Sequence, residues 1–268
     1  MRFGISANPD ISHALRATKA AVRLLKGKHD MILESEIAEV LGLPGDRLEN
    51  IKADFVLAIG GDGTVLRALQ RTNEKVLGIN TGSLGFLAEG ESQSMSSIVS
   101  RLLSGKYRVE ERLKLKVTVA GKRLYDCVNE AVIHTAHVAK IRHYEIKVDG
   151  ALAEKVRADG IIIATPTGST SYAMSAGGPI LDPRVEAFVV AAIAPFKPSF
   201  HPFVVPATSK IQVSFVRPKA GMLVLDGQQD LPLDGDEKIL LTESEKKARL
   251  VRLGDNFYRR IQEKLTNP

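Results

Sequence analysis

The stretch FVLAIGGDGT, Phe55–Thr64, decides the fold. Its first six residues form a continuous apolar run, which is typical of a strand buried on both faces of a parallel sheet. The following residues, TVLRALQRT, have the apolar spacing of a helix. A glycine-rich turn between a buried strand and a helix gathers free backbone N–H groups and the positive end of the helix dipole. This stretch therefore predicts an anion site in an α/β fold.

The sequence on either side extends this pattern into a domain. Strand-like segments at 2–6, 31–33 and 75–80 alternate with helical segments, which predicts a doubly wound, Rossmann-like parallel sheet over residues 1–100. After a helix near residue 100, alternation with a period of two dominates, so residues 101–254 are expected to form a β-rich domain. The expected strands cover residues 114–119, 123–133, 144–163, 210–216, 222–228 and 238–243, with turns at Asp149-Gly150, Asp226-Gly227 and Asp234-Gly235.

The last helical segment, residues 255–266, places Phe257, Ile261 and Leu265 on one face. A helix with one apolar face needs a surface against which to pack. We expect it to return to the first domain.

Composition excludes several classes of protein. The 37 basic residues exceed the 31 acidic ones by six, which suits an anionic substrate, whereas the 5% aromatic content and the lack of a basic cluster disfavour nucleic acid. Cys127 is the only cysteine, so an internal disulfide is impossible and a small buried side chain is expected. The chain has no apolar run of about 18 residues and no signal peptide, so no membrane association and a cytoplasmic location are expected.

Asp62 is the informative residue of the glycine-rich turn. The turn lacks the G-K-[ST] ending of a Walker loop and the spacing of a dinucleotide fingerprint. A carboxylate repels phosphate, so Asp62 has a purpose there if it accepts a proton from an attacking hydroxyl or holds a divalent metal. The alternative is that Asp62 only caps the following helix.

Two further segments carry polar groups where apolar ones are expected. Residues 164–180, ATPTGSTSYAMSAGGPI, form a hydroxyl- and glycine-rich loop that can surround a sugar phosphate, or a long turn bonded to its own backbone. Asn129 and Glu130 interrupt an apolar strand, so they face a ligand or a structural network. Neighbouring residues of a regular strand point to opposite faces, so both reach one ligand only at a bulge or a strand end.

Together, GGDGT, NTGSLGFL, VNE, RADG, TPTGSTSY, GGP and DGQ resemble the NAD kinase family from Asp54 to Gln228. The resemblance implies an α/β domain, a C-terminal β-sandwich domain and a site between them. It implies that Asp62 is the catalytic aspartate, acting on the ribose 2′-hydroxyl of the adenosine half. The NAD-binding residues that it implies are Gly61, Gly63 and Thr64 along phosphates, Asn129 and Glu130 at the adenosine, Arg157 and Asp159 near the nicotinamide end, and Thr170, Ser171 and Tyr172 in the pocket.

The expected reaction moves the γ-phosphoryl of ATP, or a phosphoryl of polyphosphate, to NAD and gives NADP. Mg²⁺ is expected to arrive with the nucleotide, because the sequence offers no dedicated metal site. The family also implies a homodimer or homotetramer. The phosphoryl donor and the use of NADH stay open. Where many members carry a histidine and an arginine, this chain has Phe196 and His201, so those roles are not assigned, nor is one for Lys197.

Two other functions remain open. GGDGT also occurs in lipid and sugar kinases, and the basic residues beside the apolar face of the last helix leave room for a lipid acceptor. A non-catalytic NAD sensor is the second alternative. Asp62 disfavours it, because pure binding gains nothing from a negative charge among phosphates.

Overall fold

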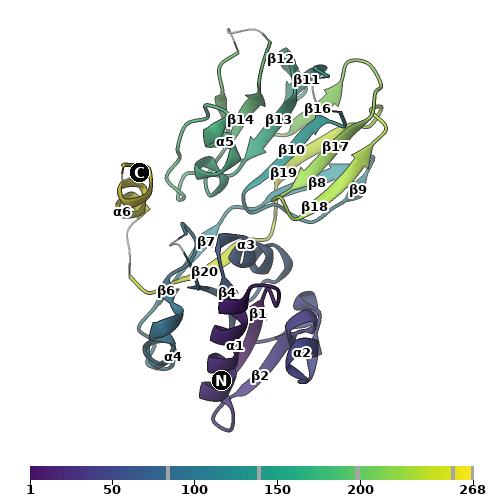
Figure 1. Ribbon diagram of the computed structural model, residues 1–268. Coiled ribbons are helices and arrows are strands. Elements are labelled where there is room, and N and C mark those ends of the chain that lie inside the picture. Colours follow the sequence, from purple (N-terminus) through teal and green to yellow (C-terminus); the bar gives the residue numbers. More distant parts are fainter. Residues whose placement is uncertain (83–84, 138–139, 197–199, 255–256, 267–268) are drawn as a thin grey trace. The chain divides into compact units, whose positions relative to one another are not determined.

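The chain divides into two units (Figure 1). The computed structural model describes residues 1–82, 85–137, 140–196, 200–254 and 257–266. Residues 1–111 and 248–268 form the first unit, and residues 112–247 form the second. Within the described ranges, no helix combines the length and the apolar character needed to cross a bilayer.

The first unit contains an eight-stranded sheet with the order β3-β2-β1-β4-β5-β20-β7, and β6 also pairs with β5. The pairs β1–β2, β1–β4, β2–β3, β4–β5, β5–β6 and β5–β20 are parallel. The strands are β1 (Arg2–Ala7), β2 (Asp30–Glu34), β3 (Gly45–Asp46), β4 (Phe55–Gly60), β5 (Val76–Asn80), β6 (Gly90–Glu91), β7 (Arg108–Arg112) and β20 (Ala248–Arg252).

Helices connect these strands, as the alternating pattern predicted. Every residue of β4 is buried, which confirms its position inside a parallel sheet. Apolar residues of the sheet and of α1 and α4 form one core. The helical elements are α1 (Ser12–Leu25), α2 (Ser35–Leu41), α3 (Asp62–Arg71), α4 (Met95–Leu103), α6 (Phe257–Ile261), the 3₁₀ turns Leu48–Asn50 and Ser92–Ser94, and the π-helical turn Gln262–Thr266.

The border of the first unit differs from the sequence-based division. Strands β7 and β20 belong to its sheet, whereas the pattern assigned both segments to the β-rich domain. Strand β20 lies between β5 and β7, and its residues Leu250, Val251 and Arg252 are buried there. The chain therefore crosses to the second unit after β7 and returns with β20. The local pattern does not reveal this, because β7 and β20 are short and neither is a continuous apolar run like β4.

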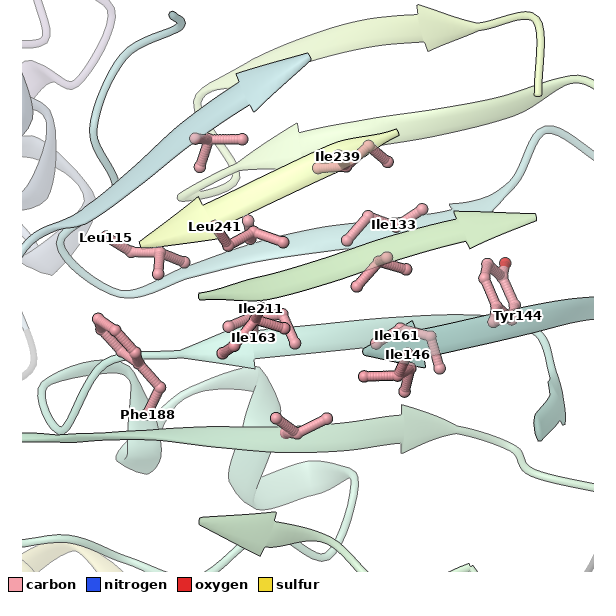
Figure 2. Packing of buried hydrophobic residues seen from close by; sticks show 14 of the residues in the cluster. Leu115, Ile133, Tyr144, Ile146, Ile161, Ile163, Phe188, Ile211, Ile239 and Leu241 are labelled. Carbon is pink, nitrogen blue, oxygen red and sulfur yellow. The ribbon is translucent and has the colours of Figure 1, made fainter. Parts of the chain in front are cut away.

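The second unit consists of two six-stranded antiparallel sheets, β15-β14-β13-β10-β17-β18 and β12-β11-β16-β19-β8-β9. Apolar residues of both sheets form one core, including Leu115, Ile133, Ile146 and Ile161 (Figure 2). The β-sandwich expectation is thus confirmed. The elements are β8 (Leu115–Val119), β9 (Lys122–Arg123), β10 (Glu130–Thr135), β11 (Arg142–Val148), β12 (Ala151–Ala158), β13 (Gly160–Ala164), a 3₁₀ turn (Gly168–Thr170), α5 (Tyr172–Ser175), β14 (Ala187–Ile193), β15 (Phe203–Pro206), β16 (Ile211–Phe215), β17 (Gly221–Leu225), β18 (Gln229–Leu233) and β19 (Ile239–Glu243).

One expected strand is wrong. Residues 123–133 do not form a single strand, because only 122–123 and 130–135 are in strands, and Cys127 between them makes a single bridge to Leu115. The backbone N–H groups of Val128, Asn129 and Glu130 bind the Asp226 carboxylate instead of a neighbouring strand. Asn129 and Glu130 therefore lie at the beginning of β10. A strand end is one of the two places where neighbouring side chains can face the same ligand.

Candidate functional site

The first group of site residues lies where β4 ends and α3 begins. Gly61 precedes the helix in an extended conformation, and Asp62, Gly63 and Thr64 form its first turn. Buried Thr64 donates its N–H to the Gly61 carbonyl at 3.0 Å. The first N–H groups of a helix have no partner within it, so this corner has the polarity that a phosphate requires. The predicted strand–turn–helix arrangement is confirmed.

The Asp62 side chain is fixed by backbone N–H groups of a neighbouring loop. Its Oδ2 accepts the N–H of Phe86 at 2.5 Å, and its Oδ1 accepts those of Leu87 and Ala88 at 3.0 and 3.3 Å. A side chain on Gly85 would place its Cβ 1.7 Å from Oδ1, so the loop approaches this closely only with glycine there. Among the described residues, the Asp62 carboxylate thus bonds to this loop and not to the first N–H groups of α3. The helix-capping alternative therefore does not account for it.

Asn129 and Glu130 are held from two sides at the beginning of β10. Besides the three N–H bonds to Asp226, the Val128 carbonyl accepts the Thr165 hydroxyl at 2.5 Å, and the Asn129 carbonyl accepts the Thr165 N–H at 2.8 Å. A Cβ on Gly168 would lie 2.3 Å from the Asn129 carbonyl oxygen, so the hydroxyl-rich loop packs directly on this turn. The backbone of the pair is thus fixed.

Buried Glu130 carries a strongly perturbed carboxyl group. Burial, and to a smaller extent the charge of Asp226, raise its pKa to about 8, although a hydrogen bond from the Ser171 hydroxyl opposes the shift. Among the described residues, the buried Glu130 Oε2 and Asn129 Oδ1 have no hydrogen-bond partner. Buried polar atoms are almost always paired, so these two oxygens point to a ligand.

Asp226 and Lys114 form the buried charges behind this pair. Asp226 lies in the β17–β18 turn with a left-handed φ of 53°. Burial raises its pKa to about 6, and the three N–H bonds and the Lys114 charge oppose the shift. Lys114 is 1% exposed, and burial lowers its pKa to about 8 although Asp126 and Asp226 favour its charged form. The sequence analysis identified the Asp226 turn but missed this carboxylate's role, and nothing local distinguishes Lys114 from a surface lysine.

A cavity of about 540 Å³ opens on the β10 side of the second unit. It brings together the predicted residues Glu130, Asp159 and Tyr172, and Ser171 joins them through its bond to Glu130. The lining residues that the sequence analysis missed are Val132, His134, Thr135, Ala136, Ile193, Val224 and Gly227. Val132 and His134 follow Glu130 at intervals of two along β10, a signal available once the beginning of the strand is known.

Other predicted residues lie elsewhere. The exposed Arg157 guanidinium lies over the ring of Phe196, 4.4 Å from its centre, and does not line the cavity. The Thr170 hydroxyl donates to the Thr167 carbonyl of its own turn at 3.3 Å. His201 is exposed, and Lys197 lies outside the described residues. Gly61, Asp62, Gly63 and Thr64 belong to the first unit, and the cavity belongs to the second.

Comparison with known families gives two matches. The profile of the ATP-NAD kinase N-terminal domain matches residues 43–107, and that of the ATP-NAD kinase C-terminal domain matches residues 128–253.

Curated relatives match over nearly the whole chain. The NAD kinase of Thermoplasma volcanium is 40% identical, and the match covers 99% of this chain and 98% of the relative. The NAD kinase of Methanothermobacter thermautotrophicus is 42% identical, with 99% and 96% covered.

Two solved structures share the fold. Yeast NADH kinase complexed with NADH has a TM-score of 0.90 at 24% identity, covering 100% of this chain and 88% of the other. An NAD kinase from Archaeoglobus fulgidus in complex with ATP has a TM-score of 0.79 at 29% identity, with 99% of both chains covered. The two domain profiles and the full-length relatives all carry the name of one family. The chain belongs to the ATP-NAD kinase family.

Proposed function

We propose that the protein transfers the γ-phosphoryl group of ATP to the 2′-hydroxyl of the adenosine ribose of NAD, giving NADP and ADP. The observation that carries this proposal is the Asp62 carboxylate, fixed among glycines at the phosphate-binding corner. A carboxylate there hinders phosphate binding but serves an incoming alcohol. The relatives' names support NAD as acceptor, and the A. fulgidus complex supports ATP as donor.

In this reaction the bond between the γ-phosphorus and the β,γ-bridging oxygen breaks, and a bond to the ribose oxygen forms. The proton of the hydroxyl passes to Asp62. A carboxylate has about four acceptor positions, and three N–H groups use three of them, so one stays open for the alcohol. The N–H bonds fix the direction of that position. Phosphoryl transfer depends mainly on such alignment and on charge neutralisation.

Mg²⁺ is proposed as the divalent cation that neutralises the phosphate charges. Within the described ranges, no group of three or more His, Cys, Asp or Glu side chains is arranged to hold a metal. Three N–H groups and the incoming alcohol account for the about four acceptor positions of the Asp62 carboxylate. The side chains present therefore favour a cation that is bound by the nucleotide phosphates over one that is bound by Asp62.

The test replaces Asp62 by asparagine. With NAD, ATP and Mg²⁺, we expect kcat to fall by roughly 10²–10⁴-fold while NAD binding, measured by calorimetry, persists. NADP is detected with an NADP-specific dehydrogenase. The matched control is Asp30→Asn, which changes an exposed carboxylate at the amino end of β2 and keeps wild-type turnover. Wild-type turnover in Asp62→Asn would refute the proposed role.

The same assay decides the open alternatives. Polyphosphate in place of ATP tests the donor, and NADH in place of NAD tests the acceptor. Tight NAD binding without ATP-dependent product would identify a sensor, and phosphorylation of lipid or sugar alone would identify the other kinase class. The homodimer or homotetramer and the cytoplasmic location are further predictions, which light scattering and cell fractionation test.

A further inference from the structure

The loop that holds Asp62 is itself held from its other side. Its segment Phe86–Glu89 presents N–H groups to Asp62 and carbonyl groups to two arginines that follow the second unit in the chain. These are Arg252 at the end of β20 and Arg260 in α6, and both belong to the first unit.

Arg260 makes the more direct contacts. Its Nη1 donates to the carbonyl oxygens of Phe86 and Ala88 at 2.8 and 2.7 Å, and its Nη2 pairs with the Glu89 carboxylate. Arg260 is 3% exposed. Arg252 donates to Glu89 at 2.5 Å and to the Leu87 carbonyl at 3.5 Å. The buried, planar guanidinium group of Arg260 thus bonds to two carbonyl groups of the loop at once.

One peptide group connects Arg260 to Asp62. The Phe86 carbonyl and the Leu87 N–H belong to the same peptide plane: the carbonyl accepts from Arg260, and the N–H donates to Asp62 Oδ1 at 3.0 Å. Withdrawal of electron density from a carbonyl by a cation strengthens the N–H of that peptide as a donor. A peptide plane is also rigid, so fixing one side fixes the other.

The loop binds β20 and α6 through different groups. Glu89 binds the β20 end through Arg252 and through the Leu253 N–H at 2.8 Å. Arg260 of α6 adds bonds to two carbonyl groups of the loop backbone, which are the bonds that reach the peptide groups beside Asp62. The Lys264 ammonium, 4.8 Å from the centre of the Phe86 ring, adds a second contact between this segment and the loop.

We propose that Arg260 is a positioning residue for Asp62, acting through the peptide groups of residues 86–88. This inference rests on the proposed function, in which Asp62 directs the alcohol. It assigns a role in turnover to the C-terminal helix, which lies about 200 residues after Asp62 in the sequence.

The experiment compares Arg260→Lys with Arg259→Ala. Lysine keeps a positive charge beside Glu89 but lacks the planar fork that reaches two carbonyls and a carboxylate together. We expect kcat to fall by about 10- to 100-fold with KM for NAD unchanged, because a small displacement of a reacting group has effects of that size. The control changes the neighbouring exposed arginine, which pairs with Glu263 on the helix surface, and keeps wild-type kcat.

Two readouts separate positioning from general stability. Hydrogen exchange of the Leu87 and Ala88 amides is expected to accelerate in Arg260→Lys, because their donor geometry is lost. In the Asp62→Asn background, Arg260→Lys is expected to cause no further loss of kcat, since both changes disable the same group. All rates are measured well below each variant's melting midpoint.

The experiments distinguish a failure of the Arg260 role from a failure of the Asp62 role. Unchanged kcat in Arg260→Lys, unchanged amide protection, or a full additional loss in the Asp62→Asn background would overturn the positioning role and leave the proposed function intact. Wild-type turnover of Asp62→Asn would instead remove the proposed function of Asp62, whatever Arg260 does.

Discussion

At the scale of single residues, Glu130 shows how burial changes the protonation of a carboxyl group. The residue is 6% exposed, and the pKa of about 8 keeps its carboxyl group protonated at neutral pH. A protonated carboxyl can donate one hydrogen bond and accept others, which suits a ribose hydroxyl. Its Oε2 is buried and has no hydrogen-bond partner among the described residues.

Glu130 also makes stability depend on pH. Its pKa is raised in the folded state from the ordinary 4.5 to about 8, so between these values the folded protein holds a proton that the unfolded chain has lost. The stabilisation of the folded state by this proton is fully present below about pH 4.5 and is lost as the pH rises through about 8. Glutamine does not titrate. As the pH rises across this window, we therefore expect the free energy of unfolding of Glu130→Gln to increase relative to that of the wild type, by on the order of a few kcal/mol.

Urea unfolding at about pH 5 and about pH 9 measures this difference. Glu186→Gln, which changes an exposed glutamate, serves as control and should follow the wild type at both values. Parallel pH profiles for Glu130→Gln and wild type would show that the carboxyl group titrates normally.

At the scale of elements, the beginning of β10 depends on Asp226. Its carboxylate binds the N–H groups of Val128, Asn129 and Glu130 at 2.8, 2.8 and 3.0 Å. Bonds to a charged acceptor are stronger than neutral ones, and an N–H that loses its partner inside a protein is costly. This turn keeps its shape because one acceptor serves three donors.

We expect Asp226→Ala to reduce the free energy of unfolding by about 2–3 kcal/mol and to raise KM for NAD more than it lowers kcat. The physical reason is that Asn129 and Glu130 lose their fixed backbone, whereas Asp62 belongs to another unit. Thermal unfolding and steady-state kinetics measure the two effects. Asp234→Ala is the matched control, because that exposed aspartate occupies the next turn. Equal KM values in the two variants would contradict the role of Asp226.

At the scale of the whole molecule, the first unit is built from both ends of the chain. Strand β20 completes its sheet between β5 and β7, so residues 1–111 alone lack an internal strand. The second unit is continuous and has its own core.

We therefore expect truncation after Lys247 to disrupt the first unit and to spare the second. Hydrogen exchange should show lost protection in β4 and β5, because a gap opens in a sheet buried on both faces, while β13 and β14 keep theirs. Truncation after Ile261, which retains β20 and Arg260, is the control and should preserve protection in both units. Full protection of β5 without β20 would show that the sheet does not need its internal strand.

Much of the site could be predicted from short segments. The strand–turn–helix at Gly60–Thr64, the hydroxyl-rich loop and the Asp149-Gly150 turn depend on local apolar patterns and on glycine geometry, and the structure confirms these elements. The buried strand β14 and the short, mostly unburied strand β15 were not assigned, because short apolar runs do not distinguish a strand from other segments.

The sequence by itself determined the fold class, because it follows from local periodicity. It also indicated Asp62, Asn129 and Glu130 as candidate residues, because they are polar groups among glycines or apolar residues, whereas the other candidates came from the family resemblance. Only the tertiary structure decided what holds those residues in place. Asp226 binds a turn 96 to 98 residues away, and Arg260 binds a loop 172 to 174 residues away. Such partners depend on how distant strands pair, and strand pairing depends on the packing of the whole sheet.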